Sequence, residues 1–198
     1  MSQQISSTPA AVPAASHAWL ELWWKAFTHP SVATFASIAN DARSSRNAAY
    51  GWVVRAALVA GFILGLTQSR ASFGGICLGV ILAALFSLLL FTAGASHWIA
   101  RALGGSGTYD TLAFATAAYF APSLLIGTAL NMIPYAGLFV ILLWIYQLVL
   151  NVVAVKAVHR LSWVQAVVPS VVLAVLNIMA IACVLVAMIA LDVQQAGG

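Results

Sequence analysis

The sequence predicts an all-α membrane protein: a polytopic bundle of five transmembrane helices preceded by a short interfacial amphipathic helix. Hydrophobic residues make up 63% of the 198 residues and charged residues only 6%, whereas a soluble domain carries about 25% charged residues. The few charges also leave long uncharged intervals, which suit a bilayer because a charge near its centre is costly. These observations exclude most soluble enzymes and leave little chain for a second, water-soluble domain.

The N-terminal residues are expected to lie outside the bilayer. Residues 1–16 are rich in Ser, Pro and Ala and carry no charged side chain, so we expect a disordered tail. They also lack the basic region and the adjoining apolar region of a secretory signal. Residues 17–47 are expected to form a cytoplasmic interfacial segment.

The interfacial segment is expected to begin with an amphipathic helix. Trp19, Trp23 and Phe27 recur at helical spacing, and Glu21 lies four residues before Lys25. Aromatic rings beside a cation suit the headgroup level of a membrane. A short helix packed against the bundle is the alternative. A second short amphipathic turn is predicted by the apolar residues Val32, Phe35 and Ile38.

A five-helix transmembrane domain is expected over residues 48–191. Its spans cover roughly residues 48–67, 74–96, 111–131, 134–155 and 166–190. The third and fourth share one uncharged interval of about twice the length that one span needs, and residues 131–137 form a turn that divides it. Arg55 interrupts the first span near one end, where its long side chain reaches the interface. Residues 192–198 remain as a short external tail.

The basic residues orient this bundle. With the N-terminus in the cytoplasm, only Arg70 lies outside, which agrees with the excess of Lys and Arg that cytoplasmic loops carry. The C-terminus then faces the exterior. The basic residues on the cytoplasmic side are Lys25, Arg43, Arg46, Arg55, Arg101, Lys156 and Arg160.

Small residues four apart predict the faces on which the helices pack, because small side chains let helix backbones approach in lipid. A dedicated dimer interface is the alternative use of such faces. The sets are Ala57, Gly61 and Gly65 on the first span, Gly75, Gly79, Ala83 and Ser87 on the second, and Ala113, Ala117 and Ala121 on the third.

The candidate intramembrane polar contacts are Tyr119 on the third span, Gln147 and Asn151 on the fourth, and Asn177 on the fifth. Gln147 and Asn151 share a helix face because they lie four residues apart. Amides inside the membrane usually hydrogen-bond across helices, and contact with a substrate or a lipid headgroup is the alternative.

Several kinds of active site are absent from the sequence. All four acidic residues lie outside the spans or at their margins, which disfavours a proton or sodium relay. The four histidines show neither metal-ligand spacing nor a paired nucleophile. Gly104–Gly107 lacks the ending of a phosphate-binding loop, so a flexible turn is favoured. We therefore expect no catalytic, cofactor-binding or metal site, and no nucleic-acid partner.

The candidate contacts to lipid headgroups or to a partner lie on the cytoplasmic side, with simple anchoring by positive charge as the alternative. They are Trp23, Lys25, Arg55, Arg101, Lys156, His159 and Arg160. Ser162 and Gln165 have the spacing of a capping box and predict the start of the fifth span.

Several segments in this order resemble the bacterial form of the Yip1 domain family. They are residues 29–35, the run Leu103–Tyr109, residues 118–122, residues 144–155 and residues 156–162. The likeness covers roughly residues 27–190. It implies a five-helix integral membrane protein without known catalysis. Eukaryotic relatives act in vesicle trafficking and engage prenylated Rab GTPases, but their Asp-Leu-Tyr-Gly-Pro motif is absent here, so Rab binding is not implied.

The favoured hypothesis is a non-enzymatic scaffold or accessory subunit of a bacterial cytoplasmic membrane. It would act through helix packing and through contacts with the lipid bilayer, a membrane-protein partner or a second copy of itself. The alternative is a small transporter or channel for an uncharged solute, lined by the four intramembrane polar residues.

Overall fold

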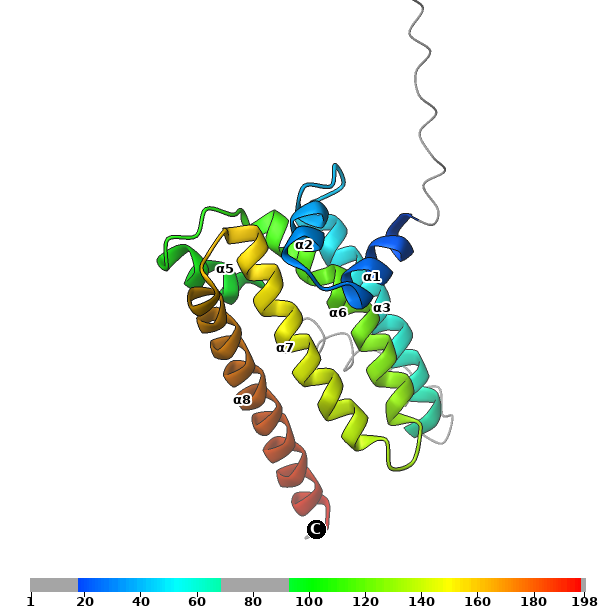
Figure 1. Cartoon of the computed structure of the whole chain (residues 1–198). Coiled ribbons are helices and arrows are strands. Elements are labelled where there is room, and N and C mark those ends of the chain that lie inside the picture. Colours follow the sequence, from blue (N-terminus) through cyan, green and yellow to red (C-terminus); the bar gives the residue numbers. More distant parts are fainter. Residues whose placement is uncertain (1–17, 69–92, 197–198) are drawn as a thin grey trace, which may run out of the picture.

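The computed structural model describes residues 18–68 and 93–196, and this part of the chain contains helices and no strands. Two short helices, α1 and α2, precede the long ones (Figure 1). The helices are α1 Ala18–Thr28, α2 Val32–Ala39, α3 Arg46–Gln68, α5 Ala93–Ala102, α6 Tyr109–Asn131, α7 Gly137–His159 and α8 Trp163–Ala196.

Three of these helices are long and apolar enough to cross a membrane: α3, α6 and α7. Within the residues whose side chains are described, the apolar part of α8 covers Trp163–Met179. These four helices lie where the first, third, fourth and fifth spans are predicted. Most of the second predicted span and its small-residue face, together with Arg70 and the N-terminal tail, lie outside the described residues.

Two helices extend beyond the edges of the predicted spans. α5 covers Ala93–Ala102 and so passes residue 96, and α8 runs to Ala196, within the predicted tail of residues 192–198. Neither stretch contains a Pro or a Gly that would end the helix earlier. The point at which the sequence becomes less apolar therefore marks the edge of each predicted span but not the end of the helix.

α6 lies at the centre of the described bundle and contacts α1, α2, α3, α5 and α7. Every residue from Leu112 to Tyr119 is buried. The predicted small-residue faces of α3 and α6 are confirmed as packing faces within the chain, since Ala57, Ala113 and Ala117 are fully buried. α8 packs on α7 and α5 at the edge of the bundle.

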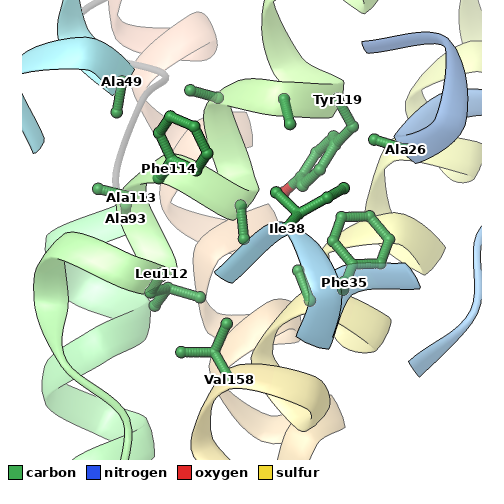
Figure 2. Packing of buried hydrophobic residues seen from close by; sticks show 14 of the residues in the cluster. Ala26, Phe35, Ile38, Ala49, Ala93, Leu112, Ala113, Phe114, Tyr119 and Val158 are labelled. Atoms are coloured by element: carbon green, nitrogen blue, oxygen red, sulfur yellow. The ribbon is translucent and has the colours of Figure 1, made fainter. Parts of the chain in front are cut away.

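The helices α1 and α2 are docked onto the bundle rather than lying free at its surface. Ala26, Phe35 and Ile38 are fully buried, and Figure 2 shows Phe35 and Ile38 close to Tyr119 of α6. The ring centroids of Phe35 and Tyr119 are 6.0 Å apart in an edge-on arrangement. The packed helix, which was the alternative for this segment, thus describes it better than a helix held by the interface alone.

The connections between helices follow the predicted turn chemistry. Residues 132–136 join α6 to α7, and Tyr135 adopts a left-handed conformation with φ of 66°. The capping box is confirmed: the Ser162 backbone N–H donates to Gln165 Oε1 at 3.2 Å, and the Gln165 N–H donates to Ser162 Oγ at 3.4 Å. Arg160, with φ of 55°, ends α7 in the left-handed region.

Replacing Ala117 of α6 by Leu is expected to lower the free energy of unfolding by about 1–3 kcal/mol, because added methylenes in a filled core force neighbouring backbones apart. The change can be measured as a shift in the unfolding transition of the detergent-solubilised protein. Ala129→Leu is the matched control, since Ala129 lies on the same helix but is exposed. Equal effects of both substitutions would contradict the central position of α6.

Candidate functional site

A cavity of about 710 Å³ lies between α3, α6, α7 and α8, and all four predicted intramembrane polar residues line it. Those residues are Tyr119, Gln147, Asn151 and Asn177. No residue described in its lining carries a formal charge at neutral pH. Its size lies within the range of about 300–1,000 Å³ that is common for small-molecule sites.

One wall of the cavity carries a chain of hydrogen bonds that joins three helices. The Tyr119 hydroxyl donates to Asn151 Oδ1 at 3.1 Å, and Asn151 Nδ2 donates to Ser170 Oγ at 3.2 Å. The Ser170 hydroxyl in turn donates to the Ala166 carbonyl at 3.1 Å. All three side chains are buried, so this chain ties α6, α7 and α8 together in the way that polar groups usually do in membranes.

The other two amides on the cavity are not used in this way. Gln147 lies one turn before Asn151 on α7, and Asn177 lies two turns after Ser170 on α8. Both are partly exposed, and neither makes a hydrogen bond to any described residue. An amide offers donors and an acceptor, so the cavity presents unused hydrogen-bonding groups of no net charge.

Ser170 and Thr116 are cavity residues that the sequence analysis missed. Spacing was the available signal: Ser170 precedes Asn177 by two helical turns, and Thr116 precedes Tyr119 by three residues, so each shares a face with a predicted residue. Ser and Thr hydroxyls readily hydrogen-bond to carbonyl oxygens of their own helix. Hydrophobic patterning therefore does not identify them as cavity residues.

Most of the predicted headgroup contacts lie on α1 or at the C-terminal ends of α5 and α7, and Figure 1 shows α1, α2, α5 and the α7–α8 connection toward one end of the described helices. Lys25, Arg55, Arg101 and Arg160 are exposed. Lys156 is half-buried: its Nζ donates to the Leu161 carbonyl at 3.0 Å and lies 4.8 Å from the centroid of the Trp163 ring. Through these two contacts, Lys156 also stabilises the connection between α7 and α8.

Exposed tryptophans accompany these cations. Trp98 of α5 is 77% exposed and Trp24 of α1 is 69% exposed. Asp41, which lies at the same end, is paired with Arg43 at 2.8 Å, and the side-chain hydrogen bond from Arg43 lowers the pKa of the Asp41 carboxyl. Because the Asp41 carboxylate is paired with Arg43, it does not neutralise the other basic side chains at this end.

Two predicted headgroup contacts pack against neighbouring segments instead: Trp23 is partly buried and His159 is buried. Trp23 packs edge-on between Trp19 and Trp52, with ring centroids 4.7 and 6.1 Å away. His159 is only 1% exposed. Both are turned inward because α1 and the last turn of α7 are covered by neighbouring segments, which hydrophobic spacing in a single helix does not reveal.

The Gly104–Gly107 segment, predicted to be a flexible turn rather than a phosphate-binding loop, packs against the end of α7. A Cβ on Gly107 would lie 2.6 Å from the Val158 carbonyl oxygen, and Gly104 has φ of 91°, so close approach and backbone geometry both require glycine here. The backbone N–H groups of Gly105 and Ser106 donate to the Ala100 and His159 carbonyls. Those two N–H groups are therefore occupied and do not form a phosphate cradle.

The described residues contain no group of three or more His, Cys, Asp or Glu side chains that could hold a metal ion.

A protein-family model described as Yip1 domain matches residues 24–186. The match begins within α1 and ends within α8, so it includes most of the docked helices, the cavity and the end of the bundle that carries Lys25, Arg46, Arg101 and Arg160, here called the basic end. No curated protein and no solved structure matches the chain.

Replacing Asn151 by Leu is expected to lower stability by about 1–2 kcal/mol, because the substitution removes an interhelical hydrogen-bond chain and leaves the Tyr119 hydroxyl without its acceptor. Gln147→Leu is the matched control on the same helix, and we expect it to leave stability unchanged or to raise it. Denaturation in mixed detergent micelles measures both. A larger loss for Gln147→Leu than for Asn151→Leu would contradict the assignment.

Proposed function

The chain belongs to the Yip1 domain family, and from that premise we propose that it is a non-enzymatic membrane scaffold whose basic end binds anionic lipid headgroups. This end would lie on the cytoplasmic side of a bacterial inner membrane, with five spans and the N-terminus inside. The same end would also be the contact site for a membrane-protein partner or a second copy of the chain.

The observation that carries the proposal is the gathering of basic residues at one end of the described helices. Lys25, Arg46, Arg101 and Arg160 lie in or beside α1, α3, α5 and α7, at the ends of these elements that meet there. The turn of residues 132–136 at the opposite end carries no charged residue. Basic residues attract anionic lipids at short range, so this asymmetry supports one binding face.

The exposed tryptophans of the basic end support a membrane partner over a soluble one. Trp24 and Trp98 present large rings to the surroundings, and tryptophan is favoured where apolar and polar layers meet. Lys25, which follows Trp24, and Arg101, which lies three residues after Trp98, would then lie at headgroup level. The docking of α1 and α2 on α6 and α7 fixes these groups relative to the bundle, as a scaffold requires.

Lipid retention in native mass spectrometry tests this proposal. The protein, purified in mild detergent, is titrated with phosphatidylglycerol or with phosphatidylcholine of the same acyl chains. We expect a clear preference for phosphatidylglycerol that falls with added salt. The double variant Arg46→Gln/Arg55→Gln should lose about fivefold in that preference for each charge, from roughly 1 kcal/mol per basic residue near a membrane surface.

Glu21→Gln is the matched control, because it removes an exposed charge of opposite sign from the same end. It should keep or increase the preference for the anionic lipid. Equal retention of the two lipids by the unmodified protein would overturn the proposal.

A second candidate function is passage of an uncharged solute, favoured by the unused amides of Gln147 and Asn177 in the cavity. The buried chain of Tyr119, Asn151 and Ser170 opposes it. Tyr119 also packs against Phe35 of α2, so this side of the cavity is filled by protein. A binding pocket agrees better with that arrangement than a continuous path does.

Glycerol flux into proteoliposomes distinguishes the two functions. For a scaffold, we expect the swelling rate measured by light scattering to equal that of protein-free liposomes. A faster rate that Gln147→Leu and Asn177→Leu both abolish would favour the solute pathway. A faster rate that neither substitution alters would place any pathway outside this cavity.

A further inference from the structure

The chemistry of the cavity between α3, α6, α7 and α8 restricts what it can bind. Most of its described lining is apolar, including Leu124, Leu143, Leu148 and Leu173, and none of that lining carries a formal charge at neutral pH. A charged group in such surroundings would lose its hydration and meet no opposite charge. A ligand of this cavity is therefore uncharged and largely apolar.

Three polar side chains of the lining are nevertheless left with unused hydrogen-bonding capacity. Thr116 is buried, and its Oγ1 has no hydrogen-bond partner among the described residues. The amides of Gln147 and Asn177 also line the cavity, and neither bonds to a described residue. Ser123 and Thr128 differ, because their hydroxyls donate to carbonyls of their own helix at 2.6 and 2.9 Å. Polar groups away from water are normally paired, so the three unused groups favour a ligand with hydroxyl and carbonyl groups.

The cavity is long and has a polar end. On α6 its lining extends from Thr116 to Asn131, a length of about 22 Å at 1.5 Å per residue. On each of α6, α7 and α8, the lining residue nearest the basic end is polar: Thr116, Asn151 and Ser170. At the other end, Asn131 Nδ2 donates to the Gly127 carbonyl of its own helix. An elongated molecule with one polar head matches this arrangement.

Exposed apolar side chains border the cavity where α7 and α8 lie side by side (Figure 1). Ile141 and Ile145 of α7 line it and are 59% and 55% exposed, and Ile178 of α8 lines it and is 60% exposed. In a bilayer, such side chains meet lipid acyl chains. The border of the cavity therefore suits entry of a ligand from the membrane rather than from water.

We propose that this cavity binds one uncharged single-chain lipid of the monoacylglycerol class. The hydroxyls and the ester carbonyl of its head would pair with Gln147, Asn177 and Thr116, since an amide both donates and accepts. Its acyl chain would lie along the leucines of the lining. A phospholipid would bring a phosphate that no cation of the described lining neutralises. The site lies apart from the basic end, so this inference does not rest on the binding of anionic lipid there.

Competitive photolabelling tests the site. The full chain, in phosphatidylcholine nanodiscs, is irradiated with a monoacylglycerol that carries a diazirine in its acyl chain, and labelled peptides are identified by mass spectrometry. We expect labels within residues 116–131, 140–151 and 170–178 that 1-oleoylglycerol suppresses. Oleyl sulfate, which has the same chain length and a permanent negative charge, should not suppress them.

Ala174→Phe should abolish the suppressible labelling, because Ala174 lines the cavity and the added ring would fill it. Ala129→Phe is the matched control, since Ala129 is exposed on α6, and it should label as the unmodified protein does. Gln147→Leu and Asn177→Leu should each weaken competition by 1-oleoylglycerol about threefold to tenfold, through the loss of one hydrogen bond.

Three results would overturn the proposal: labelling that 1-oleoylglycerol does not suppress, equal suppression by oleyl sulfate, or suppressible labelling that persists in a folded Ala174→Phe variant. If Ala174→Phe does not fold, the two amide variants decide the result. Gln147 and Asn177 make no hydrogen bond to a described residue, so these variants should fold. Unchanged competition in both of them would also contradict the site.

Discussion

The close approach that α6 permits is the constraint on which the rest of the structure depends. A membrane gives helices little hydrophobic reason to associate, so contact between backbones must supply the attraction. Ala113, Ala117 and Ala121 keep α6 narrow over its buried half, and five other helices reach it as a result. The cavity, the docked α1 and α2 and the basic end all keep their positions relative to this helix.

Tyr119 connects the two functional regions through that central helix. Its ring packs against Phe35 of α2, while its hydroxyl reaches Asn151 on the cavity wall. The short helices that carry exposed Trp24 and Lys25 are thereby joined, through one side chain, to the polar groups inside the bundle.

Sequence reasoning predicted the parts of this protein that follow from local chemistry. Charge placement located α3, α6 and α7, the Pro and Gly of residues 131–137 located the turn, and the spacing of Ser162 and Gln165 located the start of α8. Contacts between distant segments were harder to predict. The burial of Phe35 and His159 depends on what covers them, and an amphipathic face has the same pattern whether it meets lipid or another helix. The four cavity residues were identified individually, but only the fold shows that two are paired and two are not.

The length of α8 has a consequence for how the protein sits in a bilayer. A helix of 34 residues extends about 51 Å at 1.5 Å per residue, and a bilayer with its headgroups is about 40–45 Å thick. Because α8 begins beside the basic end, a course along the membrane normal would carry its last turns beyond the far headgroups. Two arrangements accommodate this hydrophobic mismatch. Either α8 tilts within the membrane, or its polar C-terminal end, which includes Gln194 and Gln195, projects from the opposite surface.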